Sequence, residues 1–399
     1  MWQPKREHAL QDRPPGVPSK RAADSRSDTG APARNHQGPV VGIVGGYGAV
    51  GRAAARCLAA EGFRLRVGGR SAQAAWSLAH QLGGATQARV VDAMDDQSLR
   101  HFSRGCLTVL DCTGGGASTL PRIRRAAMDA GAHFVSTLTD PTVAARPGDR
   151  CVVLAAGFSP GLSEMLDELL SARLANDTHF TGYYGGLRVF NHSAALECLR
   201  GLALAHGSAP GSGTDPLAGL PRLFPDSSRP IVCHRTVLPG AQTPVSAKDQ
   251  NAAARWYRAF DGTHVLGALA RFTAGGPRRN LESASHELAR ASALDCAGAT
   301  PYHLVYGVVE GRTPDGSTVR RDLLIRDIDG SGLVGATAAA AVVKVSAGRV
   351  PLGTHHAADV LAARDVITRV RRHLPDSTVR MTRRPASGTA TDDSLPARS

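Results

Sequence analysis

The glycine-rich segment Gly46-Tyr47-Gly48-Ala49-Val50-Gly51 constrains the fold of this chain more than any other feature. It fits the pattern G-x-G-x-x-G, follows the apolar run PVVGIVG and opens the helix-like segment AVGRAAARCLAAEG. A strand, this pattern and a helix in succession predict a dinucleotide-binding unit. We expect Gly46 to allow the tight turn, Gly48 to let the backbone approach a pyrophosphate, and Gly51 to let the helix pack closely. A glycine-rich turn without a ligand is the alternative.

Apolar runs and helical segments alternate from residue 39 to residue 158. Strands that alternate with helices favour a parallel sheet with helices on both faces. Six strands are the number of a complete dinucleotide-binding fold, so we expect an α/β fold with a doubly wound Rossmann-type parallel sheet. The predicted strands are 39–45, 63–70, 88–95, 106–116, 132–140 and 151–158, and the predicted helices are 49–62, 71–84, 96–105 and 119–131.

The middle of the chain predicts a second, mixed α+β domain. Alternating apolar residues over 302–327 flank the turn residues Pro314-Asp315-Gly316, which is typical of a β-hairpin. Two helices are expected after it, at 333–348 and 357–374, the second packing back on the first domain. The predicted division is a disordered tail (1–38), a dinucleotide-binding domain (39–157), a substrate domain (158–331), returning helices (332–375) and a second disordered tail (376–399).

The end of the second predicted strand indicates which dinucleotide binds. NAD sites usually carry Asp or Glu there, which binds the ribose 2′-OH and would repel a 2′-phosphate. This chain has Gly69-Arg70-Ser71 instead. An arginine can fork onto a phosphate and a serine can donate a hydrogen bond to it, so NADP(H) is the expected cofactor. Arg70 as an ordinary surface residue is the alternative.

Three further cofactor contacts are predicted from topology alone. Asp92 follows the third strand and is expected near the adenosine half of the cofactor. Thr113 and Gly114 follow the fourth strand and are expected at the nicotinamide half.

The composition of the chain limits the kinds of partner that we expect. The net charge is +13, and only four of the 47 basic residues are Lys. No nucleic-acid-binding motif accompanies the charge, so we expect no nucleic acid as partner, although an acidic carrier protein would suit an Arg-rich surface. The seven dispersed cysteines show no metal-type spacing, so no metal is expected. Neither a secretory signal nor a membrane-spanning run is visible, and we expect a cytoplasmic protein.

One tempting motif fails on chemical grounds. Gly157-Phe158-Ser159-Pro160-Gly161 matches the hydrolase pattern G-x-S-x-G. In that pattern the residue after the serine donates its backbone N–H to the oxyanion. Pro160 has no N–H, which argues against a serine hydrolase.

Three blocks of the sequence match a known family: VVGIVGGYGAVGRAAARCLA with VGGRS, then AAGFSPGLSEMLDELL, then GLVGATAAAAVVKVSAGRVPLGT. Through them the chain resembles the saccharopine dehydrogenase-like oxidoreductases over residues 40–375 or so, the last block being similar to the family's returning helix, glycine turn and strand. The resemblance implies NADP(H)-dependent hydride transfer and a mixed substrate and dimerisation domain inserted before the final helices. It also implies a substrate segment at Phe158, Ser159 and Pro160, and a possible homodimer.

Departures from the family pattern argue against saccharopine as the substrate. Ser159 stands where true saccharopine reductases have Asp, and Tyr184 stands where they have Cys before a paired Gly. Divergent relatives reduce C=N or C=C bonds, some on intermediates held by carrier proteins.

The predicted proton donors are Tyr183, Tyr184 and His192, because Tyr and His have suitable acid chemistry and follow the substrate segment. Ordinary packing roles, and a proton taken from solvent, are the alternatives. Glu164 is expected only as a partner of the helix dipole.

We therefore expect an NADPH-dependent reductase of a C=N or C=C bond of a small or carrier-bound metabolite, in natural-product biosynthesis. An amino-acid dehydrogenase acting on a secondary amine and a non-catalytic NADP(H)-binding sensor are the other hypotheses.

Overall fold

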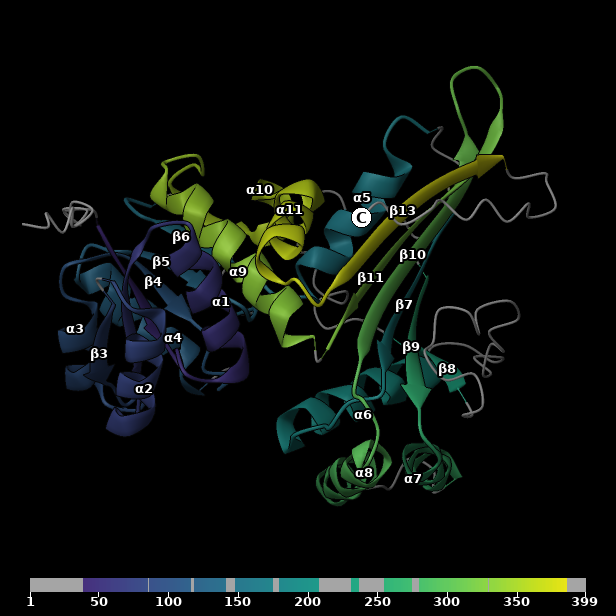
Figure 1. The fold of residues 1–399 in the computed structure, drawn as a ribbon, viewed down its shortest axis with the longest axis horizontal. Helices are drawn as coiled ribbons and strands as arrows, with labels where there is room; N and C mark the ends of the chain where they lie inside the picture. The colour runs from purple at the N-terminus through teal and green to yellow at the C-terminus, as the bar shows by residue number, and fades with distance from the viewer. Residues whose placement is uncertain are drawn as a thin grey trace, which may run out of the picture. The chain divides into compact units, whose positions relative to one another are not determined.

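The computed structural model describes residues 39–84, 86–115, 118–140, 148–174, 179–207, 231–236, 255–274, 280–328 and 330–385. Two β-sheets, each with its own helices, make up this part of the chain (Figure 1). The calls on residues 1–38 and 386–399 lie outside it.

A seven-stranded sheet carries the glycine-rich segment. Its strand order is β12-β6-β5-β4-β1-β2-β3, and every neighbouring pair is parallel. All five residues of the first strand are buried, as a strand covered on both faces requires. The strands are β1 (Val40–Val44), β2 (Arg64–Gly69), β3 (Gln87–Val90), β4 (Cys106–Asp111), β5 (His133–Ser136), β6 (Cys151–Leu154) and β12 (Gly353–His356).

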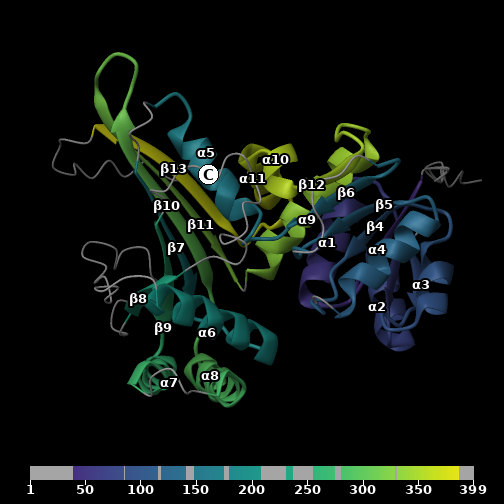
Figure 2. The same ribbon diagram turned by 180° about the vertical axis from the view of Figure 1, so that it is seen from behind.

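Helices cover both faces of this sheet, which is the doubly wound arrangement (Figure 2). Buried residues of α1, α2 and α9 belong to one core cluster, and those of α3 and α4 belong to a second. The helices are α1 (Ala49–Ala60), α2 (Ala72–Leu82), α3 (Asp96–Ser103), α4 (Leu120–Asp129) and α9 (Ser331–Ser346).

Helix α9 returns from the second sheet and is buried on nearly all sides. Its sequence is rich in small residues, and small residues allow helices to approach closely. A Cβ added at Gly335 would lie 2.6 Å from the Ala53 Cβ of α1. The hydroxyls of Thr108 on β4 and Ser346 on α9 lie 3.1 Å apart. Gly335 therefore sets how closely α9 packs on α1.

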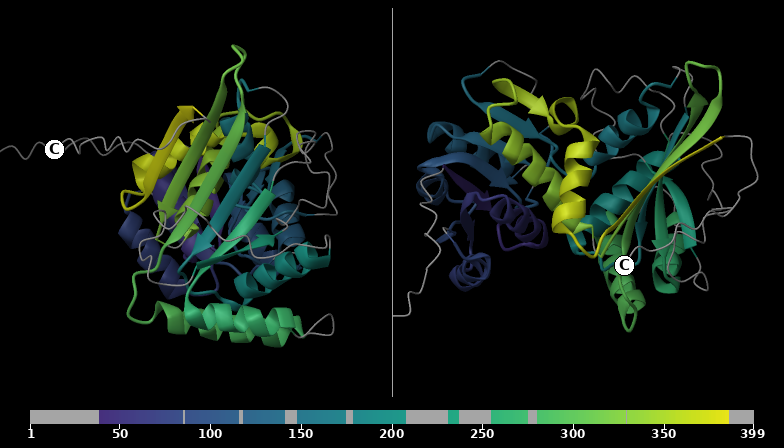
Figure 3. Two further views of the ribbon diagram at one scale, coloured as in Figure 1. Left: turned by 90° about the vertical axis from the view of Figure 1, so that its right-hand side faces the viewer. Right: turned by 45° about the horizontal axis from the view of Figure 1, so that its top comes forward.

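A six-stranded sheet forms the second part, in the order β13-β11-β10-β7-β9-β8. Only β7 and β9 pair in parallel, so the sheet is mixed. The left panel of Figure 3 shows its strands side by side, with β13 at one edge. The strands are β7 (His179–Gly186), β8 (Ile231–Thr236), β9 (Arg255–Asp261), β10 (His303–Arg312), β11 (Thr318–Asp327) and β13 (Thr378–Pro385).

In the part of the chain that the structure describes, four helices accompany this sheet. Helix α5 (Leu162–Ser171) packs on β10, and Arg321 of β11 donates a 2.9 Å hydrogen bond to the Leu170 carbonyl. The other three, α6 (His192–Gly207), α7 (Thr263–Ala274) and α8 (Leu281–Cys296), share a separate apolar cluster.

The last helical segment forms two helices rather than one. α10 (Ala357–Val360) and α11 (Ala363–His373) replace the single helix expected over 357–374. The backbone at Leu361 is extended, with ψ of 165°. Arg369 of α11 pairs with Glu61 at the end of α1 at 2.9 Å.

Two other expectations need correction. The sheet has seven strands rather than six, because β12 joins beside β6. The disordered tail predicted from residue 376 is wrong for Thr378–Pro385, which forms β13 and pairs with β11 along eight residues. Most β13 side chains are exposed, so the strand lacks the apolar alternation by which a half-buried strand is recognised.

Candidate functional site

The glycine loop lies between β1 and α1, at the carboxyl edge of the parallel sheet. The residue with positive φ is Gly45, at 77°, so it makes the tight turn that we had assigned to Gly46. A Cβ at Gly45 would lie 2.8 Å from the Cys112 backbone. Gly46 donates its N–H to the Gly68 carbonyl of β2 at 2.9 Å. Glycine is required at position 45 by both the dihedral angle and the space.

The rest of the loop and the start of α1 can receive an anion. A Cβ at Gly51 would lie 2.2 Å from the Gly45 carbonyl oxygen, so α1 starts directly against the loop. Gly48 and Ala49 are exposed, and Val50 is half-buried. The first helical N–H groups have no intrahelical partner and carry the positive end of the helix dipole. The exposed backbone at this helix start fits a pyrophosphate.

Tyr47, a variable position of the glycine pattern, supports the end of β2. Its hydroxyl accepts a 2.9 Å hydrogen bond from the Ser71 N–H. Its ring lies over Gly69, where an added Cβ would come within 2.4 Å of the ring. A larger side chain at position 69, a carboxylate included, would therefore have to displace the Tyr47 ring.

Arg70 and Ser71 follow Gly69 at the surface. The Ser71 Oγ caps α2 by accepting from the Ala74 N–H at 3.2 Å, which leaves its own proton available for donation. Arg70 is exposed. A cation, a hydroxyl donor and a helix start at one strand end suit a phosphate group.

Buried Asp111 at the end of β4 organises the next loop. Its Oδ1 accepts from the N–H of Thr113 at 2.9 Å and from the Thr113 hydroxyl at 2.8 Å, and its Oδ2 accepts from Ser136 at 3.2 Å. Burial raises the pKa of the Asp111 carboxyl, and these hydrogen bonds partly oppose the rise. Sequence reasoning missed this residue, although an Asp closing an apolar strand before Thr-Gly-Gly is a usable signal.

The predicted loop residues have local roles. Thr113 is held by Asp111 and lies 3.0 Å from the Thr119 hydroxyl, and Gly114 has φ of 68°. Asp92 is exposed after β3, and its Oδ1 accepts from the Met94 N–H at 2.9 Å. Their contacts with a cofactor stay predictions.

The segment after β6 carries the predicted substrate residues. Gly161, with φ of 133°, donates its N–H to Glu164, which also accepts from the Ser163 hydroxyl at 2.9 Å. Glu164 thus lies in the first turn of α5, as expected. Pro160 is buried, and Phe158 and Ser159 are half-buried.

Phe158 contacts the second sheet. Its ring centroid is 5.4 Å from that of Tyr184, 6.4 Å from Trp256 and 6.0 Å from His303. These rings come from β7, β9 and β10. The carboxyl end of β6 therefore leads directly to one face of the six-stranded sheet.

Two arginines lie near this group: Arg258 over Tyr184, and Arg188, whose charge acts on His303. Arg258 lies over Tyr184, 5.1 Å from the ring centroid, and Arg188 lies 4.9 Å from the Phe190 centroid. Burial, with the positive charges of Arg188 and Arg258, holds the pKa of His303 well below its ordinary value. The imidazole is therefore neutral at neutral pH. We call Phe158, Tyr184, Trp256, His303, Arg188 and Arg258 the aromatic–arginine cluster.

Two polar atoms beside Phe158 are buried without a hydrogen-bond partner in the described part of the chain. They are the Ser159 Oγ and the His303 Nδ1. Buried polar atoms are normally hydrogen-bonded, so each such atom calls for an explanation. A bound ligand would supply one. Sequence reasoning predicted Ser159 as a site residue. It missed His303 and three members of the aromatic–arginine cluster: Arg188, Arg258 and Trp256.

The three predicted proton donors are not together. Tyr184 is in the aromatic–arginine cluster. Tyr183, the next residue of the strand, points to the other face and stacks on Tyr257 at 5.3 Å. His192 begins α6 and contacts Ser285 and Glu282 of α8.

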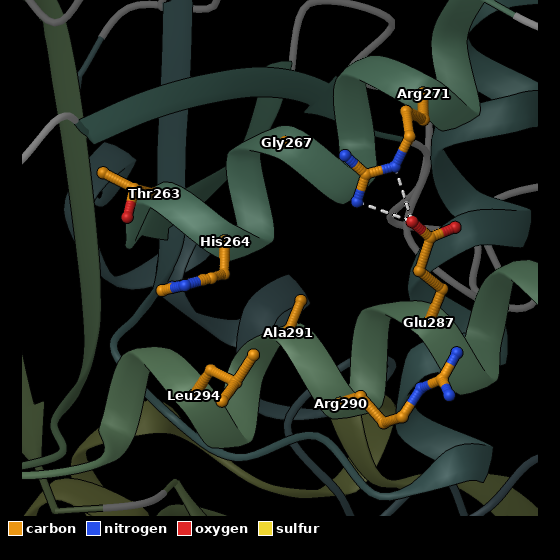
Figure 4. A pocket seen from close by; sticks show the side chains of 8 residues that line it. All are labelled: Thr263, His264, Gly267, Arg271, Glu287, Arg290, Ala291 and Leu294. Atoms are coloured by element: carbon orange, nitrogen blue, oxygen red, sulfur yellow. Dashed lines mark hydrogen bonds and ion pairs between the residues drawn. The ribbon is translucent and has the colours of Figure 1, made fainter.

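A pocket of about 400 Å³ lies elsewhere, between α7 and α8 (Figure 4). It includes the ion pair of Arg271 with Glu287 at 2.6 Å, together with His264 and the exposed Leu294. The absence of a side chain at Gly267 leaves the space open. None of the predicted site residues lines it, so we do not assign the hydride chemistry to it.

Comparison with known families identifies the first domain. Residues 41–152 match the family model described as the saccharopine dehydrogenase NADP binding domain. The match confirms NADP(H) as the cofactor and supports the resemblance drawn from the sequence. A comparison with curated protein sequences found no match.

One solved structure shares the fold over most of this chain. Apo saccharopine dehydrogenase (L-Glu forming) from Saccharomyces cerevisiae superposes with a TM-score of 0.57 at 12% identity, covering 87% of this chain and 100% of that chain. At this identity the likeness shows the fold alone. An actinorhodin polyketide ketoreductase with NADPH (17% identity, 25% and 53% covered, TM-score 0.23) and serine dehydrogenase from Escherichia coli (12%, 24% and 60%, 0.22) overlap less.

Within the described residues, no helix has the length and apolar content needed to cross a bilayer.

Proposed function

We propose that this chain, a member of the saccharopine dehydrogenase-like NADP-binding family, is an NADPH-dependent reductase of a C=N or C=C bond in a small or carrier-bound metabolite. Its place in natural-product biosynthesis and in the cytoplasm is part of the same proposal. Tyr184, rather than Tyr183 or His192, is the proposed proton donor.

The observation that carries the proposal is the arrangement of side chains at the end of β2. Tyr47 covers Gly69 and occupies the space of a carboxylate there, while Arg70 and Ser71 remain exposed. This arrangement favours the phosphorylated dinucleotide, the form that reductases commonly use as hydride donor.

The aromatic–arginine cluster supports a reduction. The nicotinamide of NADPH, when bound, would supply the hydride. The rings of Phe158, Tyr184 and Trp256 keep water from the reacting bond. The Tyr184 phenol can supply the proton. Neutral His303 and the Ser159 hydroxyl hold a polar group of the substrate by hydrogen bonds.

An amino-acid dehydrogenase is the second candidate. Arg188 and Arg258 both act on His303, and two neighbouring cations suit a substrate with a carboxylate. Activity with imines of amino acids, and none with carrier-bound thioesters, would favour this candidate.

The cofactor site is tested by calorimetric titration with NADPH and with NADH. Arg70→Ala should weaken NADPH binding about ten- to hundredfold, as expected for loss of a charge-assisted hydrogen bond. NADH binding should not change. Arg290→Ala, an exposed arginine of α8, is the matched control. Equal NADPH affinity in Arg70→Ala and the wild type would show that Arg70 does not bind the 2′-phosphate.

The chemistry is tested by NADPH oxidation with a panel of imines and enones, free and carrier-bound. Tyr184→Phe should lower kcat with little change in KM, because the ring stays and only the acid is lost. Tyr183→Phe, on the opposite face of the strand, is the control. NADPH binding without turnover of any substrate in the panel would favour the non-catalytic sensor.

A further inference from the structure

A cluster of three potential metal ligands lies where α6 meets α8. His192 is the first residue of α6, and Glu282 and His286 are one turn apart on α8. Residues four apart on a helix share a face. One ligand atom from each of the three lies within 4.8 Å of the other two. The cluster is separate from the glycine loop and from the aromatic–arginine cluster.

The hydrogen bonds of Ser285 fix the orientation of the His192 ring. The buried Ser285 hydroxyl donates to the Glu282 carbonyl oxygen at 2.6 Å, so its single proton is used. Its Oγ lies 2.9 Å from the His192 Nδ1. Because the hydroxyl has no second proton, Nδ1 must be the donor in that contact. The neutral His192 then carries its lone pair on Nε2.

That lone pair faces a carboxylate. The His192 Nε2 lies 2.8 Å from the Glu282 Oε1. Two acceptor atoms at that distance repel each other unless a proton or a metal cation is bound between them. An ion pair of protonated His192 with Glu282 would satisfy these two residues without any third one.

His286 brings a third donor to the same place. Its ring stacks on that of His192, with centroids 4.3 Å apart and an interplanar angle of 21°. An imidazole binds a metal through a lone pair in the plane of its ring, so the exposed His286 must turn out of this stack to reach an ion held by His192 and Glu282. Two imidazoles and a carboxylate are a donor set that zinc accepts.

We propose that His192, Glu282 and His286 bind one zinc ion, with water in the remaining position. The second contact of His192 supports this, because metal-binding histidines usually donate their other ring N–H to an oxygen. Zinc at bond lengths of about 2.0–2.1 Å separates its ligand atoms by about 3.3 Å, so His192 Nε2 and Glu282 Oε1, now 2.8 Å apart, must separate slightly while His286 moves in. Glu282 and His286 are exposed and free of core packing, and short side-chain rotations allow both movements.

The zinc ion joins the start of α6 to the first two turns of α8. The unfolded chain separates His192 from Glu282 by about ninety residues, so the ion binds the folded form and stabilises it. This role is independent of the proposed reductase activity.

The test is calorimetric titration of the chelator-treated full chain with ZnCl₂ in a non-coordinating buffer, followed by thermal unfolding with and without zinc. We expect one equivalent to bind and the Tm to rise. His286→Ala should abolish both effects; because this side chain is exposed, the variant should keep the metal-free Tm of the wild type. Ser285→Ala should weaken binding about ten- to hundredfold, as expected for a residue that orients a ligand.

His264→Ala is the matched control, because His264 is an exposed histidine of the adjacent α7 that pairs with Asp295. It should bind zinc like the wild type. The proposal is overturned if no zinc binds, or if His286→Ala and His264→Ala bind it equally. Circular dichroism of His192→Ala and His286→Ala without zinc shows whether each variant folds.

Discussion

Tyr47 shows how one side chain narrows the choice of cofactor. The G-x-G-x-x-G pattern leaves its position open, so the sequence alone gives the tyrosine no role. In the structure its ring occupies the space that a side chain at position 69 would need, and its hydroxyl holds the Ser71 N–H. The absence of a carboxylate at position 69 and the presence of Tyr47 therefore belong together, although the two positions are 22 residues apart.

His303 should make stability depend on pH. Burial and the charges of Arg188 and Arg258 lower its pKa, so the folded state binds fewer protons than the unfolded state below pH ~6.5. The stabilising contribution is present above pH ~6.5 and is lost as pH falls towards the lowered pKa. Between pH 7.5 and 5 the loss should reach up to about 2 kcal/mol.

Urea unfolding of the wild type and of His303→Leu at both pH values measures this effect. The variant should lose less stability than the wild type on acidification. His133, whose pKa is also lowered by burial, titrates in both proteins and cancels in the difference. An equal loss in both proteins would contradict the assignment.

At the scale of elements, α9 and α1 pack through small residues. An added Cβ at Gly335 would lie 2.6 Å from the Ala53 Cβ and 2.7 Å from the Ala54 backbone nitrogen. Backbone cannot move aside as a flexible side chain can. The contact is therefore specified by the absence of a side chain.

Gly335→Ala should destabilise the protein by about 1–2 kcal/mol. The energetic cost of the steric overlap exceeds the ~0.5–1 kcal/mol by which alanine stabilises a helix relative to glycine. Gly267→Ala in α7 is the control. There an added Cβ meets only the end of the Arg271 side chain, at 3.5 Å, so the same change should be neutral or stabilising. Thermal unfolding compares the two, and a Tm for Gly335→Ala at or above that of Gly267→Ala would refute the packing argument.

The regular elements of the first sheet follow the sequence pattern closely. Its first six strands and four helices lie where apolar runs and helical periodicity predict them, because central strands such as β1, β4 and β6 are buried on both faces. The hairpin at Pro314-Asp315-Gly316 was also predicted correctly. The break at Leu361 was missed, since the segment reads as one continuous helix.

At the scale of the whole molecule, β13 returns to the second sheet after the last helix. It pairs with β11 from Thr378 to Pro385, although few of its side chains are buried. Its stability comes from backbone hydrogen bonds that β11 provides. Without β13, strand β11 would be an unpaired edge of the sheet.

Ending the chain after Ser377 should therefore expose β11. The amides of β11 should exchange hydrogen at least about tenfold faster, because β11 can then open locally without first breaking its hydrogen bonds to β13. A chain that ends after Pro385 keeps the strand and should exchange like the full-length protein. Hydrogen exchange measured by mass spectrometry separates the two, and unchanged protection of β11 in the shorter chain would show that β13 contributes little.

The sequence by itself determined the parallel sheet, the glycine loop and the choice of NADP(H), because these depend on residues close together in the chain and on their periodicity. Tertiary structure alone decided which chemistry-bearing side chains meet. Tyr183 and Tyr184 are neighbours in sequence but lie on opposite faces of β7, because side chains alternate along a strand. Phe158, Arg258 and His303 come together, as do His192 and His286, only because separate strands and helices pack.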